Sequence, residues 1–203
     1  AKALSDMIAG RVNPSGKLTI TFPERIEDMP TYMNFPGDGY HVSYGEGIYV
    51  GYRYYDKKKL RPRYPFGYGL SYTTFDCRLI DAAVDGDTIK VHTSVENTGK
   101  VAGSEVVQIY IHDPYSTLSK PEKELKAFEK VMLAPGEKKD VTFTIARSSL
   151  ASYDMDLEQF TVEEGYYDIL AATSSAAEDV FGQTRIYLDV KSPYSYSVDT
   201  QLK

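Results

Sequence analysis

Carboxylates are the most abundant reactive side chains in this sequence, and two of them held across a cleft can hydrolyse a bond by acid–base catalysis. The chain has 203 residues, with 29 Asp and Glu side chains against 23 Lys and Arg. A catalytic pair needs its carboxyl groups roughly 5–9.5 Å apart, and no spacing here singles out such a pair. Glu163 and Glu164 precede Gly165 in a predicted turn, where we expect both to be solvated. The sequence therefore predicts no catalytic residue in this chain.

Metal-ligating side chains are likewise scattered. His41, His92 and His112 lie far apart in the sequence, and His92 alternates outward on its predicted strand. Asp154 and Asp156 flank a single residue but lack the ligand spacing of a calcium loop. We therefore expect no metal site.

The motifs of nucleophilic and phosphate chemistry are absent as well. Cys77 is the single cysteine, which excludes an intrachain disulfide. It lies in the first predicted strand of the sandwich, where we interpret it as a small core or half-buried residue. No serine lies in a nucleophile elbow, and no glycine-rich loop is placed to cradle a phosphate. We assign no substrate-binding residue and no cofactor.

The composition of the chain limits the classes of partner that it can bind. The net charge of −6 argues against a general nucleic-acid binder, so the basic run 57–59 is interpreted as a solvated turn. No apolar run approaches the roughly 20 residues that span a bilayer, so we expect no membrane partner. A hydrophobic fraction of 42% is ample for a folded core. The composition fits a cytoplasmic or an exported bacterial protein equally well.

The first element expected is the end of an α/β layer. Apolar residues recur at helical spacing over 1–10, and Gly10 is a plausible stop. Residues 17–22 alternate polar and apolar side chains before Pro23, which predicts a short strand. A single helix–strand unit cannot bury its own faces. We therefore expect 1–23 to be the end of an α/β domain, and the chain to begin inside a larger protein.

A connector is predicted over 24–71. Residues 24–44 are polar and irregular, and loops of this length are usually functional or boundary segments. Residues 45–75 are rich in tyrosine, but five glycines and two prolines prevent one regular element. Because tyrosine buries a ring and keeps one polar tip, we expect this stretch to fill a seam between two bodies. The residues expected in the seam are Tyr49, Tyr52, Tyr54, Tyr55, Phe66 and Tyr68. The alternative is that they fill the core of the following domain.

Short alternating strands follow from residue 72 onward. Turn signals separate strands predicted over 73–81, 88–96, 104–112, 124–133, 139–145, 161–162, 165–173 and 183–190, with one helical turn over 147–153 capped by Ser148 or Ser149. The segment 124–133 also fits a helix, and we interpret it as a strand. This pattern predicts a mainly β protein, with an antiparallel sandwich of immunoglobulin or fibronectin type III type over 72–191. Residues 192–203 are a tail or linker.

Four motifs, in this order, resemble glycoside hydrolase family 3. The run GRVNPSGKLTITFP at 10–23 resembles the end of the family's α/β sandwich domain. YGEGIYVGYRYYD at 44–56, with YPFGYGLSYTTF at 64–75, resembles its crossing into the C-terminal domain. The segments at 95–110, 120–131 and 133–137 are similar to its fibronectin type III-like domain. The resemblance covers nearly the whole chain.

The resemblance implies that the intact protein is a retaining β-glycosidase, most often a β-glucosidase. Its implied nucleophile is an aspartate of a TIM barrel, and its acid/base is commonly a glutamate upstream in the α/β sandwich domain. Neither motif occurs here, so no catalytic residue is carried over. The implied partners are the TIM barrel and the rest of the α/β sandwich, which bind the β-glucoside. We expect this chain alone to be inactive and structural, packing on the catalytic domains.

Two other interpretations stay open. The chain could be a stand-alone β-sandwich that binds carbohydrate or protein through exposed tyrosines, although it has no tryptophan, which sugar-binding faces often use. The loop 32–44 could overhang the parent active site and shape its substrate subsites. Some family members carry the barrel after the sandwich, so the resemblance is compatible with a catalytic barrel either before or after this segment.

Overall fold

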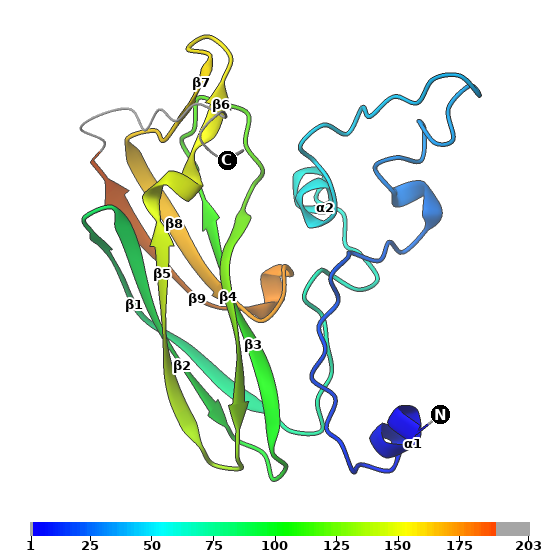
Figure 1. Cartoon of the computed structure of the whole chain (residues 1–203), viewed down its shortest axis with the longest axis vertical. Coiled ribbons are helices and arrows are strands. Elements are labelled where there is room, and N and C mark those ends of the chain that lie inside the picture. The colour runs from blue at the N-terminus through cyan, green and yellow to red at the C-terminus, as the bar shows by residue number, and fades with distance from the viewer. Residues whose placement is uncertain (1, 190–203) are drawn as a thin grey trace, which may run out of the picture.

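A β-sandwich dominates the structure, with the N-terminal third of the chain running along one side of it (Figure 1). The computed structural model describes residues 2–189. No helix in this range is long and apolar enough to cross a membrane. The helical elements are α1 (Lys2–Ile8), η1 (Ile26–Asp28), α2 (Tyr52–Lys58), η2 (Arg147–Leu150) and η3 (Ala177–Asp179). The strands are β1 (Phe75–Asp85), β2 (Thr88–Asn97), β3 (Gly103–His112), β4 (Glu124–Leu133), β5 (Lys138–Ala146), β6 (Ser152–Asp154), β7 (Gln159–Thr161), β8 (Gly165–Ala172) and β9 (Val180–Leu188).

Two antiparallel sheets make the sandwich. One has the strand order β1-β2-β5 and the other β4-β3-β8-β9, and β6 and β7 form a small separate hairpin. The mainly β prediction is confirmed, including the strand at 124–133 that also fitted a helix.

Alternation along the strands builds the core. On β2, the residues Ile89, Val91, Thr93 and Val95 are all fully buried, as their spacing predicts. They face Val107 and other apolar side chains of β3, β8 and β9 across the sandwich. Burying an aliphatic side chain of this kind contributes about 1.5–3 kcal/mol, so this core holds the domain together.

The strand predicted over 17–22 is wrong. Leu18 and Phe22 hydrogen-bond to the backbone of Tyr68 and Tyr64, but only an isolated bridge between Phe22 and Tyr64 results. Within residues 2–189, no strand lies along the other edge of this segment. A strand is stable only in a ladder, and here the backbone bends at Thr19 and Ile20 between the two contacts instead of forming a sheet strand.

Several smaller expectations also change. The basic run 57–59 is not a simple turn: Lys57 and Lys58 close α2, and Lys59 caps it in the left-handed conformation with φ 54°. The helical turn predicted over 147–153 is shorter, a 3-10 turn over Arg147–Leu150 without a side-chain cap, since the Ser149 hydroxyl donates backward to the Ala146 carbonyl. Residues 152–153 belong instead to β6. The predicted end of the last strand, Val190, and the tail 192–203 lie outside the described residues.

Candidate functional site

The candidate site is the seam where α2 and residues 59–72 lie against the sheet β4-β3-β8-β9 (Figure 1). Helix α2 is attached to the start of β4 by charged side chains on one of its faces. The pairs are Arg53–Glu124 at 2.9 Å, Asp56–Lys123 at 2.6 Å and Lys57–Glu122 at 3.8 Å. Burial raises the pKa of Asp56, although the Lys123 ammonium opposes the rise. Of the three pairs, Asp56–Lys123 is therefore the one in which removing either partner would leave the most costly unpaired charge.

Tyr52 occupies the centre of the seam. Its ring lies 5.3 Å from the Phe66 ring and meets the Tyr110 ring edge-on at 5.7 Å between centroids. Its hydroxyl accepts a hydrogen bond of 2.9 Å from the backbone N–H of Leu125 on the edge strand β4. One connector side chain thus packs on β3 and also satisfies the backbone of β4.

A buried polar group lies beneath the connector at the same place. Gln108 is 3% exposed; its side-chain amide donates to the Thr173 carbonyl at 2.7 Å and accepts from the Tyr110 hydroxyl at 2.6 Å. Gly67 closes over it with φ +84°, and a Cβ there would lie 2.6 Å from the Gln108 nitrogen. Only glycine fits this approach, so the seam is a close backbone contact over a satisfied hydrogen-bond network.

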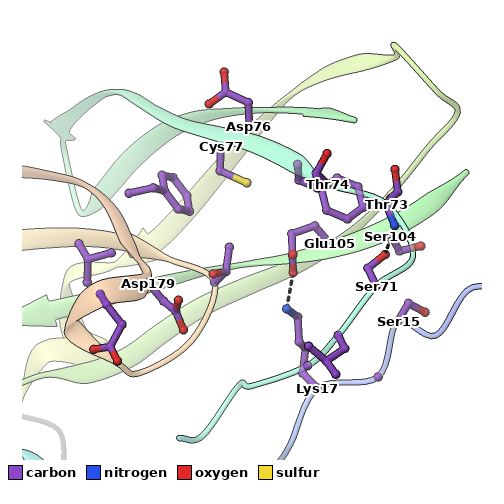
Figure 2. Close-up of a pocket in the computed structure, with 18 residues that line it drawn as sticks. Ser15, Lys17, Ser71, Thr73, Thr74, Asp76, Cys77, Ser104, Glu105 and Asp179 are labelled. Atoms are coloured by element: carbon purple, nitrogen blue, oxygen red, sulfur yellow. Dashed lines mark hydrogen bonds and ion pairs between the residues drawn. The ribbon is translucent and has the colours of Figure 1, made fainter. Parts of the chain in front are cut away.

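A cleft of about 520 Å³ lies where the N-terminal segment meets β1, β3 and β9, and its lining residues are drawn in Figure 2. Its wall carries a largely buried ion pair between Lys17 and Glu105, with 2.6 Å between charged atoms. The same Glu105 oxygen accepts the backbone N–H of Val106 at 2.7 Å. Pairing of β3 with β8 begins only at Gln108, so Glu105 occupies the stretch of the β3 edge that has no strand beside it.

Cys77 faces this cleft as well (Figure 2). Burial, reinforced by the Glu105 and Asp76 carboxylates, raises the pKa of its thiol to about 12. The thiol stays protonated at neutral pH and is a poor nucleophile. Of the two positions expected from the sequence, core or half-buried, the structure shows the half-buried one.

The six predicted seam residues divide into two groups. Tyr52, Phe66 and Tyr49 contact the sandwich: the Tyr52 ring packs on Tyr110, the Phe66 carbonyl accepts the Ser175 N–H at 2.8 Å, and the Tyr49 hydroxyl lies 3.3 Å from that of Ser119. The rings of Tyr54 and Tyr55 pack on each other at 5.6 Å, and Tyr68 packs on Tyr64 at 5.1 Å within the connector. The hydrophobic core of the described sandwich contains none of the six, so the alternative that they fill it is wrong.

Glu163 is not the solvated turn residue that the sequence indicates. It accepts hydrogen bonds from the hydroxyls of Ser116 and Thr117 and from the Thr117 backbone N–H, and it lies 3.4 Å from the Lys120 ammonium. Lys120 is 8% exposed and also pairs with Asp113 at 2.7 Å. Glu163 thus holds the loop between β3 and β4 that leads into the α2 contact.

Replacing Glu163 with glutamine is expected to destabilise the protein by about 1.5–3 kcal/mol near neutral pH, since hydrogen bonds to a charged group are lost. Burial alone would raise the pKa of Glu163, but the hydroxyl and N–H donors and Lys120 outweigh it and lower that pKa to about 2. This stabilisation is full above the unfolded pKa, about 4.3, and is lost as pH falls toward 2. Urea denaturation between pH 7 and pH 2.5 should therefore show the two proteins converging at the acid end. A constant difference across that range would contradict this role.

The remaining candidates lie apart. The Asp154 carboxylate accepts the backbone N–H groups of Asp156 and Leu157, so it shapes the β6–β7 turn. Among the described residues, no three His, Cys, Asp or Glu side chains are grouped to hold a metal ion. In the loop 32–44, Asp38 accepts the N–H groups of Tyr40 and His41, which lower its pKa and fold the tip into a turn. The idea that this loop reaches a substrate stays a prediction.

Residues that sequence reasoning missed are polar. Strand or turn positions such as Gln108, Glu105 and Lys123 usually face solvent. Here the connector covers Gln108 and Lys123, and Lys17 of the N-terminal segment pairs with Glu105. The one available signal was the glycine at 67 within an aromatic run, which indicates a close backbone approach without naming its partner.

Comparison with known proteins covers both halves of the chain. Residues 1–72 match the family model "Glycosyl hydrolase family 3 C-terminal domain", and residues 105–175 match "Fibronectin type III-like domain". The thermostable beta-glucosidase B of Acetivibrio thermocellus is 44% identical over 99% of this chain and 27% of the relative. A beta-glucosidase of Kluyveromyces marxianus is 46% identical over 85% of this chain and 21% of the relative.

Solved structures agree. The Kluyveromyces marxianus beta-glucosidase in complex with glucose superposes with a TM-score of 0.89 and 40% identity, over 95% of this chain and 23% of that one. Beta-glucosidase 3B of Thermotoga neapolitana, in complex with glucose, gives a TM-score of 0.87 over 95% of this chain and 27% of that one. The chain thus spans about a quarter of the length of the relatives it matches.

Proposed function

The chain belongs to glycoside hydrolase family 3, whose C-terminal part it forms, and on that premise we propose that it braces the catalytic domains of a β-glucosidase. In this proposal the intact protein hydrolyses terminal β-linked glucosides, and the reacting groups lie on the TIM barrel and the rest of the α/β sandwich. Residues 1–23 complete that sandwich, 24–71 form the connector, and 72–191 form the fibronectin type III-like domain.

The observation that carries the proposal is the two-sided character of the N-terminal third. One side of residues 52–72 packs on the sandwich through Tyr52 and Gly67. Elsewhere, Leu4 is 60% exposed, Ile8 76% and Ile20 58%, and no residue of α1 is buried. An apolar surface of this extent marks an interaction site. The remaining domains of the same protein are the occupant that the family relationship supplies.

The segment 17–22 supports the same occupant. Leu18 and Phe22 direct their backbone groups toward Tyr68 and Tyr64. Between these two contacts the backbone bends at Thr19 and Ile20, and no described strand lies along the other side of the segment. In the intact domain, a neighbouring strand of the α/β layer would give this segment a ladder. The alternating pattern could then form the strand that it predicts.

Hydrolysis of an aryl β-glucoside tests whether catalysis lies outside this chain. The isolated chain is expected to release no measurable product, whereas the intact protein containing it hydrolyses the substrate. Turnover by the isolated chain would place catalysis in these residues and contradict the proposal. The control is calorimetric titration of the isolated chain with glucose and cellobiose, for which we expect no binding. Binding there would favour the carbohydrate-binding module instead.

A further inference from the structure

Strand β4 carries large apolar side chains on its solvent side. Phe128 is 68% exposed and Met132 is 58% exposed, and Lys130 lies between them on the same side of the strand. Edge strands normally present charge to solvent, which guards them against association. Two exposed apolar residues around a lysine therefore need an explanation.

The strand register places this pair on a particular face of the sheet. Phe128 lies opposite Gln108, and Met132 lies opposite Ser104, whose hydroxyl is 3.0 Å from the Met132 sulfur. Residues directly opposite each other on paired strands share a face. Since Gly67 covers Gln108, the pair lies on the face against which the connector packs, but beyond the part that the connector covers.

The other sheet provides the contrast. Its outward positions on β2 and β5 are polar or charged: Lys90, His92, Asp140, Thr142 and Thr144. That composition suits a surface that stays in water. The third strand of that sheet, β1, also exposes Ile80 and Val84, so the contrast with β4 holds for β2 and β5.

We propose that Phe128 and Met132, with Lys130 between them, form a second docking surface through which the sandwich itself contacts the catalytic domains of the intact enzyme. The inference rests on the proposed function and extends it, because bracing would then not depend on the connector alone. The occupant is an apolar depression with a carboxylate for Lys130. Two observations support this choice: about three quarters of each relative lies outside the matched region, and the patch continues the face on which the connector lies.

Thiol labelling of the intact enzyme tests the surface. Phe128→Cys and Met132→Cys are the test variants, and Met155→Cys, at the 83%-exposed tip of the β6–β7 hairpin, is the matched control. Cys77 adds little background, because its half-buried thiol has a pKa of about 12. We expect a maleimide to label positions 128 and 132 at least about tenfold more slowly than position 155. Equal rates at all three positions would overturn the inference.

Two further arms separate the explanations. Ile20→Cys reports on the proposed function. Protection at position 20 with free labelling at position 128 would contradict the second docking surface and leave the proposed function standing. Free labelling at both positions would contradict both proposals. Protection at 128 that disappears as the protein is diluted to a monomer would mean a second copy is the occupant and would overturn the inference.

In the intact enzyme, Phe128→Ser with Met132→Ser should lower the melting temperature, whereas Met155→Ser with Leu157→Ser should leave it unchanged. Equal melting in both pairs would count against the surface.

Discussion

Replacing Gly67 with alanine is expected to lower the free energy of unfolding by about 2–4 kcal/mol. The backbone there has φ +84°, and a Cβ would lie 2.6 Å from the Gln108 side-chain nitrogen and 3.0 Å from the Ser174 Cα. Conformational strain and overpacking therefore add. The amide of Gln108 cannot move aside freely, since it is held by the Thr173 carbonyl and the Tyr110 hydroxyl.

Urea denaturation of the chain measures this loss, and Gly136→Ala provides the matched control. Gly136 has a similar φ of +74°, but nothing lies within 4 Å of where its Cβ would stand. Its replacement should cost about 1–2 kcal/mol, the conformational part alone. If the two variants lost equal stability, the close contact over Gln108 would contribute nothing and this description of the seam would be wrong.

Tyr52→Ala is the second large effect, with an expected loss of about 2–3 kcal/mol. Truncating a fully buried aromatic ring costs about 3–5 kcal/mol, and Tyr52 is half-buried. The loss removes the ring contacts with Phe66 and Tyr110 and leaves the Leu125 N–H without its partner. Because the same side chain joins α2, β3 and β4, we expect faster proteolysis of the connector as well.

Tyr52→Phe separates the ring from the hydroxyl. It keeps the packing and removes only the acceptor of the Leu125 N–H, so it should cost about 1 kcal/mol. Tyr40→Ala is the control, because Tyr40 is 93% exposed and its loss should change stability by less than about 0.5 kcal/mol. A Tyr52→Ala protein that melts and resists protease like Tyr40→Ala would show that the seam does not hold the connector.

Much of the sandwich was predictable because alternation directly encodes a half-buried strand. The residues Ile89, Val91 and Val95 specify the inner face of β2 without reference to any partner. The predictions fail where the secondary structure of a segment depends on the segments that lie beside it. Residues 17–22 have the same alternation but no neighbouring strand among the described residues, and α2 forms in a segment rich in glycine and tyrosine that reads as irregular.

The seam was predictable in composition but not in detail. Aromatic residues beside glycines indicated a packed connector, and Tyr52 and Phe66 behave as expected. Gln108 and Glu163 did not stand out, because a polar residue on a strand or turn usually faces water. Their roles depend on segments that arrive from at least 40 residues away, such as Gly67 over Gln108 and the Ser116–Lys120 loop against Glu163.

The central claim is that this chain contributes stability and not catalysis to the intact enzyme. Its most direct test is to measure kcat/KM for an aryl β-glucoside and the thermal inactivation midpoint on the same intact protein carrying Tyr52→Ala with Phe66→Ala. We predict an inactivation midpoint several degrees lower and a kcat/KM within about twofold of the unmodified enzyme at low temperature. An unchanged midpoint with a kcat/KM reduced tenfold or more would contradict the account, since the seam would then act on the reaction itself.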